Sequence, residues 1–126
     1  MRDQSLWTWH VVAGLVILIF LGLHMAIMHL DAILGLFNPA GNHPVEWANV
    51  VARGKMVFFT VNYIVLLGAA LFHGLYGLRN ILFELGPGAG VKKALNLLLA
   101  VGGVALFVFG SWAAWTARAV AMASTL

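Results

Sequence analysis

Apolar residues fall into three long runs that are separated by short polar segments. The runs cover residues 7–30, 57–82 and 94–117. Each is longer than the roughly 20 residues that a helix needs to cross about 30 Å of hydrocarbon at about 1.5 Å per residue. The pattern therefore predicts an all-α integral membrane protein, with three transmembrane helices in a single domain over residues 1–126.

Helix-breaking residues set the predicted ends of these helices. Pro39 cannot continue the first helix, and the sequence GPGAG at 86–90 separates the second helix from the third. The connection at 38–55 contains Asn, Pro, Gly and His, and it is predicted to be an aqueous or interfacial loop. The predicted helices cover residues 7–37, 56–85 and 91–118.

Composition supports the membrane assignment. Apolar residues make up 63% of the chain and charged residues only 9%, which is too little charge to cover the surface of a soluble domain. The chain has no cysteine, so a disulfide framework, a thiolate-held iron–sulfur cluster and c-type haem attachment are excluded. The first apolar run is too long for a cleaved signal peptide, so it is predicted to be a permanent helix.

The basic residues lie mostly near the ends of the predicted helices. With a net charge of +3, this distribution indicates membrane topology and lipid contact, and it does not indicate nucleic-acid binding. The side that holds the N-terminus has a small excess of Lys and Arg, which predicts a cytoplasmic N-terminus. The side of the N-terminus carries Arg2, Arg79, Lys92 and Lys93, and the opposite side carries Arg53, Lys55 and Arg118.

Two titratable side chains, His24 and His73, are predicted to lie within the hydrocarbon. Burying such a group there costs a few kcal/mol or more, so it usually faces a partner or a cofactor. His24 lies about 25 Å along the first helix from Trp7, whereas His73 lies about 15 Å from the N-terminal side. Imidazoles at two depths suit two cofactors stacked across the membrane better than one.

Neutral imidazole is the usual ligand of b-type haem iron, and two axial imidazoles favour electron transfer. Since His24 and His73 differ in depth, each haem would need its second ligand from another chain. We therefore predict one or two haem b groups that are shared with a partner subunit, with His73 and His24 as ligands of the haem iron. The alternatives are a packed polar residue for His24, and for His73 a histidine that is hydrogen-bonded between helices or lines a proton path.

Other polar residues of the second helix lie near His73. At about 100° per residue, His73, Asn80 and Glu84 fall on nearly one face. Arg79 lies about one and a half turns nearer the membrane surface, where a cation could neutralise haem propionates or bind a quinone carbonyl. Asn80 and Glu84 are candidates for the same roles. Alternatively, Arg79 is only a positive residue at a helix end, and Glu84 only balances charge beside the loop.

The first helix has a polar face of its own. His10 is predicted to lie at the membrane–water boundary, where it is either simply amphipathic or serves quinone binding or proton transfer. His29 points about 140° away from His24, so it is predicted to be interfacial, with a ligand role in place of His24 as the alternative. The residues that line up at helical spacing are His10, Gly14, Ile17, Leu21, His24 and Met28.

The third helix contains no histidine. Its Asn96, Gly103 and Gly110 recur every seven residues, which predicts a face that packs closely against another helix.

The segment HGLYGLRNILFELG at 73–86 resembles the second-helix motif of a known family. This family comprises the membrane anchor (cytochrome b) subunits of succinate:quinone oxidoreductases and fumarate reductases, respiratory complex II. Its pattern of a histidine, a small residue, an arginine and an acidic residue matches His73, Gly77, Arg79 and Glu84, although the acidic residue is more often aspartate in the family. The resemblance implies that His73 is an axial haem ligand.

The segment GLVILIFLGLHMAIMHL at 14–30 also resembles the first helix of such anchors, especially those with two haems. In these anchors a histidine followed by methionine ligates the haem farther from the catalytic head, which implies that role for His24. The family has an arginine or serine that contacts quinone near the start of this helix. Here His10 stands about where the arginine would be.

The resemblance also implies partners and a location. Anchors made of three-helix chains come in pairs, so it implies a second three-helix anchor subunit. It implies a flavoprotein with FAD and the dicarboxylate site, an iron–sulfur subunit on the cytoplasmic side, and membrane lipid and quinone, with menaquinone as the quinone, in a prokaryotic cytoplasmic membrane.

In this assignment the chain passes electrons between the iron–sulfur subunit and quinone, and it performs no dicarboxylate chemistry itself. Two alternatives remain open. One is a cytochrome b anchor of another respiratory dehydrogenase, and the other is a haem-free packing or proton-conducting membrane subunit.

Overall fold

The computed structural model describes residues 2–29 and 43–125, and all regular structure in them is helical. The helices are α1 (Arg2–His29), α3 (Trp47–Lys55), α4 (Val57–Glu84) and α5 (Ala89–Ala123). Three of them, α1, α4 and α5, are long and apolar enough to cross a membrane. The predicted all-α class and the three membrane spans are therefore confirmed, and the chain is a multi-pass membrane protein.

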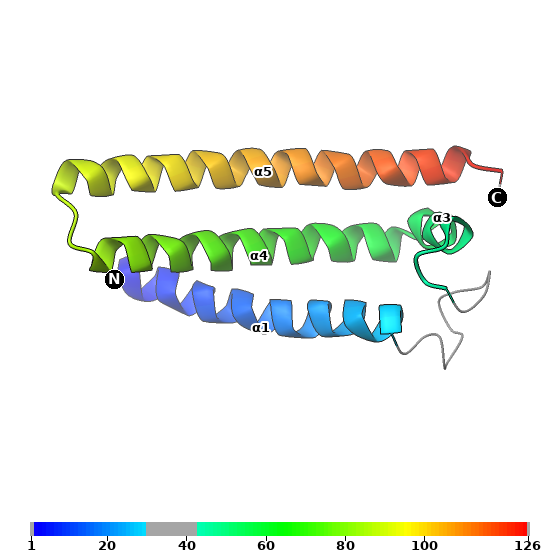
Figure 1. Cartoon of the computed structure of the whole chain (residues 1–126), viewed down its shortest axis with the longest axis horizontal. Coiled ribbons are helices and arrows are strands. Elements are labelled where there is room, and N and C mark those ends of the chain that lie inside the picture. The colour runs from blue at the N-terminus through cyan, green and yellow to red at the C-terminus, as the bar shows by residue number, and fades with distance from the viewer. Residues whose placement is uncertain (1, 30–42, 126) are drawn as a thin grey trace.

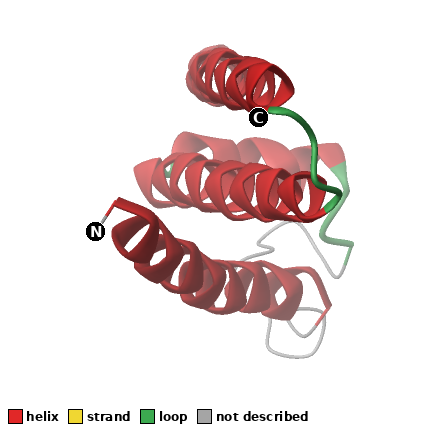
Figure 2. Cartoon of the chain, turned by 90° about the vertical axis from the view of Figure 1, so that its left-hand side faces the viewer, coloured by secondary structure: helices red, strands yellow, loops and turns green. Residues whose placement is uncertain are grey.

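The three long helices lie side by side, with α4 in the middle (Figure 1). The end-on view shows the same row (Figure 2). In the described residues α4 packs against both α1 and α5, whereas α1 and α5 do not contact each other. Few apolar side chains are buried, and both outer helices expose long apolar faces. Lipid or another membrane chain can cover such faces, because the hydrocarbon solvates apolar side chains and each helix satisfies its own backbone.

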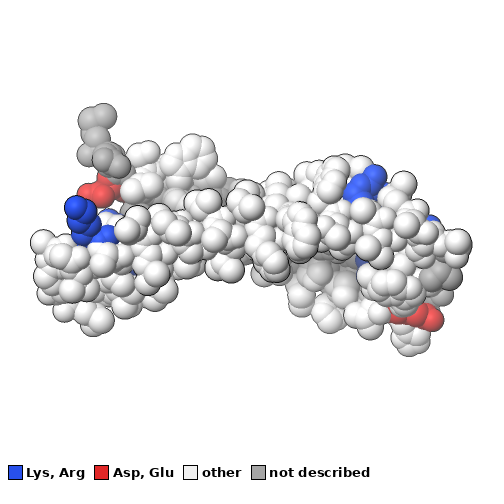
Figure 3. Space-filling view, turned by 90° about the horizontal axis from the view of Figure 1, so that it is seen from above, with Lys and Arg blue, Asp and Glu red and all other residues white. Residues whose placement is uncertain are grey.

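On the face shown in Figure 3, charged side chains gather at the two ends of the molecule and leave its middle uncharged. Asp3, Arg79 and Lys92 lie at the end that holds the N-terminus, and Arg53 and Arg118 lie at the other. This is the distribution that a membrane-spanning body requires, since a charge at the centre of the hydrocarbon is costly.

Some helix ends differ from the predicted ones. The apolar runs show which part of each helix can lie in hydrocarbon, but the backbone hydrogen bonds of a helix can continue beyond its apolar run. The start of α1 at Arg2 precedes the predicted start at residue 7. The predicted continuation over 30–37 lies outside the described residues. Both ends of α4 agree with the prediction within one residue. At α5, Gly88 serves as N-cap, so only 86–88 of the glycine-rich segment break the helix.

The predicted loop at 38–55 was wrong in its second half, where Trp47–Lys55 forms α3. This short helix is seen end-on in Figure 1, across the end of the bundle. Arg53 is buried and donates to the carbonyl oxygen of Pro44, and Arg118 of α5 donates to the carbonyl oxygen of Lys55. The bond from Arg118 explains why α5 continues past residue 118: its last turns dock against α3.

The seven-residue repeat of α5 faces α4, so the predicted packing face is confirmed. A Cβ atom on Gly103 would lie 2.7 Å from Leu75 Cδ1, and one on Gly110 would collide with the side chain of Leu67. Asn96 belongs to the same seam, where it accepts a hydrogen bond from α4. Small residues at these positions let the two helices approach closely.

Candidate functional site

His10 and His73 face each other between α1 and α4. Their rings are stacked, with centroids 4.1 Å apart and planes inclined by 5°. His73 Nδ1 lies 3.0 Å from the backbone oxygen of His10. One glycine on each helix makes room for the rings: a Cβ atom on Gly14 would lie 3.1 Å from His73 Cε1, and one on Gly77 would lie 3.4 Å from His10 Cε1.

The carbonyl oxygen of His10 determines the tautomer of His73. A carbonyl can only accept a hydrogen bond, so the contact assigns the proton to Nδ1 and leaves the lone pair of Nε2 available. Histidines that ligate a metal commonly donate their other ring nitrogen to a carbonyl in this way. The same bond and the stack also satisfy much of the imidazole without any cofactor, so the arrangement is compatible with both interpretations of His73.

His10 was predicted to lie at the membrane boundary, and the structure places it opposite His73. Because α1 begins at Arg2, His10 lies about 12 Å along the helix, level with His73. Its Nδ1 is buried and has no hydrogen-bond partner in the part of the chain that the structure describes. Its ring centroid also lies 5.2 Å from that of Tyr76. The sequence held no signal for this pairing, because it depends on how α1 and α4 align.

His24 lies at a different level of the membrane. Its ring meets Tyr63 of α4 edge-on, at a centroid distance of 6.3 Å. Tyr63 and His73 are ten residues apart on one helix, or about 15 Å, so the predicted difference in depth between the two histidines is confirmed. The cavity beside His24 has a volume of only about 20 Å³. That space holds about one water molecule, so a flat macrocycle bound by His24 would need a wall from another chain.

Arg79 turns toward α5, whereas His73 turns toward α1. Arg79 Nε donates to Asn96 Oδ1 at 2.6 Å, and Arg79 Nη1 donates to Asn80 Oδ1 at 3.0 Å. The guanidinium carbon lies 4.3 Å from the ring centroid of Phe83, within the range of a cation–π interaction. Asn80, which was predicted to share a face with His73, thus contacts Arg79, and Asn96, which the sequence indicated only as a packing residue, completes the group.

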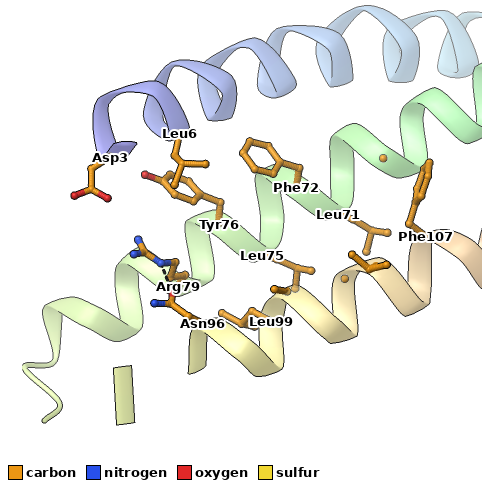
Figure 4. Close-up of a pocket in the computed structure, with 14 residues that line it drawn as sticks. Asp3, Leu6, Leu71, Phe72, Leu75, Tyr76, Arg79, Asn96, Leu99 and Phe107 are labelled. Atoms are coloured by element: carbon orange, nitrogen blue, oxygen red, sulfur yellow. Dashed lines mark hydrogen bonds between the residues drawn. The ribbon is translucent and has the colours of Figure 1, made fainter. Parts of the chain in front are cut away.

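A cleft of about 970 Å³ opens beside Arg79, between α1 and α5 and over α4 (Figure 4). Tyr76 lines it and connects it to the His10–His73 pair through the ring contact with His10. Tyr76 was not among the residues predicted for the site. Its position one turn after His73 on the same helix was the available signal.

The remaining predicted residues lie apart from these groups. His29 and Glu84 are exposed and end α1 and α4, respectively. Glu84 was predicted to share a face with His73 and Asn80. In the described residues His73 contacts His10 and Asn80 contacts Arg79, and Glu84 joins neither pair. On the predicted face of α1, His10, Gly14 and His24 meet α4, whereas Leu21 is exposed.

The chain is similar to a protein of Archaeoglobus fulgidus named succinate dehydrogenase hydrophobic membrane anchor subunit. The two are 26% identical over 104 residues, which cover 82% of this chain and 81% of the relative. No protein-family model matches the chain, and no solved structure gives a significant match. The similarity extends over most of both chains and supports the resemblance to complex II membrane anchors that the two motifs indicated.

Proposed function

We propose that this chain is a haem b-binding, quinone-reactive membrane anchor subunit of a succinate dehydrogenase or fumarate reductase. The similarity to the Archaeoglobus fulgidus anchor supports the anchor role. The observation that carries the haem assignment is the contact from His73 Nδ1 to the backbone oxygen of His10. Haem, when bound, would supply a one-electron carrier between an iron–sulfur partner and membrane quinone.

His73 is prepared for ligation by the residues around it. The hydrogen bond fixes its tautomer, the stack on His10 fixes its ring plane, and Gly14 admits the ring between the helices. A ligand that is already oriented loses little freedom when it binds iron. We assign His24 as a ligand of a second haem, with the opposite ligand and wall contributed by a second three-helix anchor.

The quinone group is proposed to bind near His10 and Tyr76, with menaquinone as the quinone. The unpaired Nδ1 of His10 is the nitrogen that could exchange a proton there, and the hydroxyl of Tyr76 can donate a hydrogen bond to a carbonyl. The Arg79 guanidinium carbon lies 5.6 Å from the Tyr76 ring centroid, and Arg79, bonded to Asn80, adds a cation that favours a reduced quinone or a haem propionate. Exposed Glu84 would be covered by a docked iron–sulfur or flavoprotein subunit.

Optical spectroscopy on the purified complex tests the haem assignment. The complex is isolated from its native membrane through a tag on this chain, and its dithionite-reduced minus oxidised spectrum and haem content are measured. We expect b-type bands, with His73→Ala and His24→Ala each removing part of the haem and His29→Ala removing none. A colourless complex, or a full spectrum in the double variant, would contradict the proposal. Succinate-dependent quinone reduction separates it from an anchor of another respiratory dehydrogenase.

One observation favours a second function, that of a haem-free packing or proton-conducting subunit. The His10–His73 pair already gives each imidazole a stacking partner and gives His73 a hydrogen bond inside the membrane. For this function we expect no Soret band, and we expect His73→Ala to weaken the packing of α1 on α4 without any spectral change.

A further inference from the structure

The short helix α3 differs from the other helices in direction and in level. Figure 1 shows it end-on, so its axis runs across the long helices, at the end of the bundle opposite to the N-terminus. Only Met56 separates it from α4. Arg118, the first charged residue after the apolar run at 94–117, donates to the carbonyl oxygen of Lys55. The helix α3 therefore lies at the level where the apolar spans end, which is the boundary between hydrocarbon and water.

The polar side chains of α3 point into the protein. Asn49 is 0% exposed and Arg53 is 5% exposed, and residues four apart share one face of a helix. Asn49 Nδ2 donates to the backbone oxygen of His43 at 2.9 Å, and Arg53 donates to the backbone oxygen of Pro44. The buried polar face thus holds the segment that leads into α3, and its hydrogen bonds are made within the chain.

The apolar side chains around α3 point outward. Val45, just before the helix, is 74% exposed, and Trp47 and Val50 are 61% and 40% exposed. Gly54, one turn after Val50, packs against α5, where an added Cβ atom would lie 2.9 Å from Ala121 Cβ. A helix on the surface of a soluble protein has the opposite arrangement, with its polar face in water and its apolar face inside. The orientation of α3 therefore suits an apolar or interfacial environment better than bulk water.

A docked protein would fit this surface less well than the bilayer does. An ordinary protein interface covers about 800 Å² and roughly 20–30 residues on each partner, with a polar rim that makes hydrogen bonds. The apolar surface at α3 consists of three side chains, and the neighbouring Asn49 and Arg53 are turned away from it. The bilayer requires no minimum area, because the chain already spans it, and tryptophan is enriched at the level of the headgroups.

We propose that α3 lies flat in the headgroup region of the bilayer, on the side opposite to the N-terminus, with Val45, Trp47 and Val50 turned into the lipid. The partner is the membrane surface as a whole. A helix in this position buries its apolar face about 5–10 Å into the boundary between headgroups and acyl chains. Because α3 is bonded to α5 and leads directly into α4, it fixes the depth of both helices. This assignment rests on the membrane fold and is independent of haem, quinone and succinate chemistry.

Thiol labelling tests the proposal, because the chain contains no cysteine and a single introduced thiol can be followed on this chain alone. Val50→Cys reports the apolar side of α3, and His43→Cys reports an exposed residue before the helix at the same end of the molecule. The intact complex in permeabilised native membranes is treated with a polyethylene-glycol maleimide, which reacts in water, and the gel shift of the tagged chain is followed with time. We expect Val50→Cys to react several-fold more slowly than His43→Cys in membranes, and equally fast after unfolding in urea. Equal rates in membranes would overturn the proposal.

Photo-crosslinking distinguishes lipid from a protein that covers the same surface. The variant Trp47→benzoylphenylalanine keeps an aromatic side chain at the most exposed position of α3. The intact complex is reconstituted into vesicles of phosphatidylcholine and phosphatidylglycerol and irradiated, and the mass of the chain is measured. We expect an adduct with the mass of a phospholipid. A crosslink to another protein chain, or no lipid adduct, would overturn the proposal. Neither readout uses the haem spectrum, so failure here and failure of the proposed function can be told apart.

Discussion

His73 contacts His10 in two ways at once: its Nδ1 lies 3.0 Å from the His10 backbone oxygen, and its ring stacks on the His10 ring at 4.1 Å. The first contact uses the backbone of α1 and the second uses a side chain. The tautomer of His73 therefore depends on the alignment of the two helices, whereas its ring plane depends on the residue at position 10. Substitutions can separate the two contributions.

Substitution of Gly14 should disturb His73 directly. A Cβ atom at this position would lie 3.1 Å and 3.2 Å from two atoms of the His73 ring, so Gly14→Val must displace the ring or the helix. Overpacking of this kind costs about 1–3 kcal/mol, and loss of the orienting contact to a ligand lowers affinity about 10–100-fold. Haem content and thermal unfolding in detergent measure the two effects. Gly22→Val, which meets nothing within 4 Å, should leave both unchanged.

Substitution of His10 should alter His73 without releasing it. His10→Ala removes the stacked ring, which is worth about 0.5–1.5 kcal/mol, but keeps the carbonyl oxygen that accepts from His73. We expect retained haem with a shifted reduction potential, measured by redox titration. His10→Phe preserves a stacking surface and should restore most of the wild-type potential. Loss of haem in His10→Phe would argue that His10 itself is a ligand.

The seam between α4 and α5 can be tested with neighbouring glycines. Gly103→Ala places a Cβ atom 2.7 Å from Leu75 Cδ1, whereas Gly102→Ala meets nothing within 4 Å. Both changes raise helix propensity by about 0.5–1 kcal/mol, so only Gly103→Ala also carries the cost of the clash, about 1–3 kcal/mol. Thermal unfolding in detergent should show a lower midpoint for Gly103→Ala than for Gly102→Ala. Equal midpoints would mean that Leu75 moves aside freely.

The docking of α3 should depend on Arg118. This side chain donates to the carbonyl oxygen of Lys55, and a hydrogen bond from a charged group contributes about 1.5–3 kcal/mol. Arg118→Gln should therefore raise amide hydrogen exchange in Trp47–Lys55 by roughly tenfold or more. Lys93→Gln removes the same charge at the opposite end of the molecule and is the control. Unchanged exchange in Arg118→Gln would show that α3 is held by its other contacts.

The long helices were readable from the sequence because their signal is local. A run of about 20 apolar residues crosses the hydrocarbon whatever surrounds it, so the three spans, the break near Gly86 and the depths of His24 and His73 all follow from counting residues at about 1.5 Å each. The close face of Gly103 and Gly110 was readable for the same reason, since a seven-residue repeat lies on one side of its own helix.

The tertiary structure decided which residues meet. Gly14 lies opposite His73 and Gly77 lies opposite His10 only because α1 and α4 align in one register out of several, and no periodicity within either helix specifies it. The helix Trp47–Lys55 is held by bonds such as the one from Arg118, more than sixty residues away in the chain. Local spacing determines where a side chain lies along its own helix, but contacts between helices depend on the packing of the whole bundle.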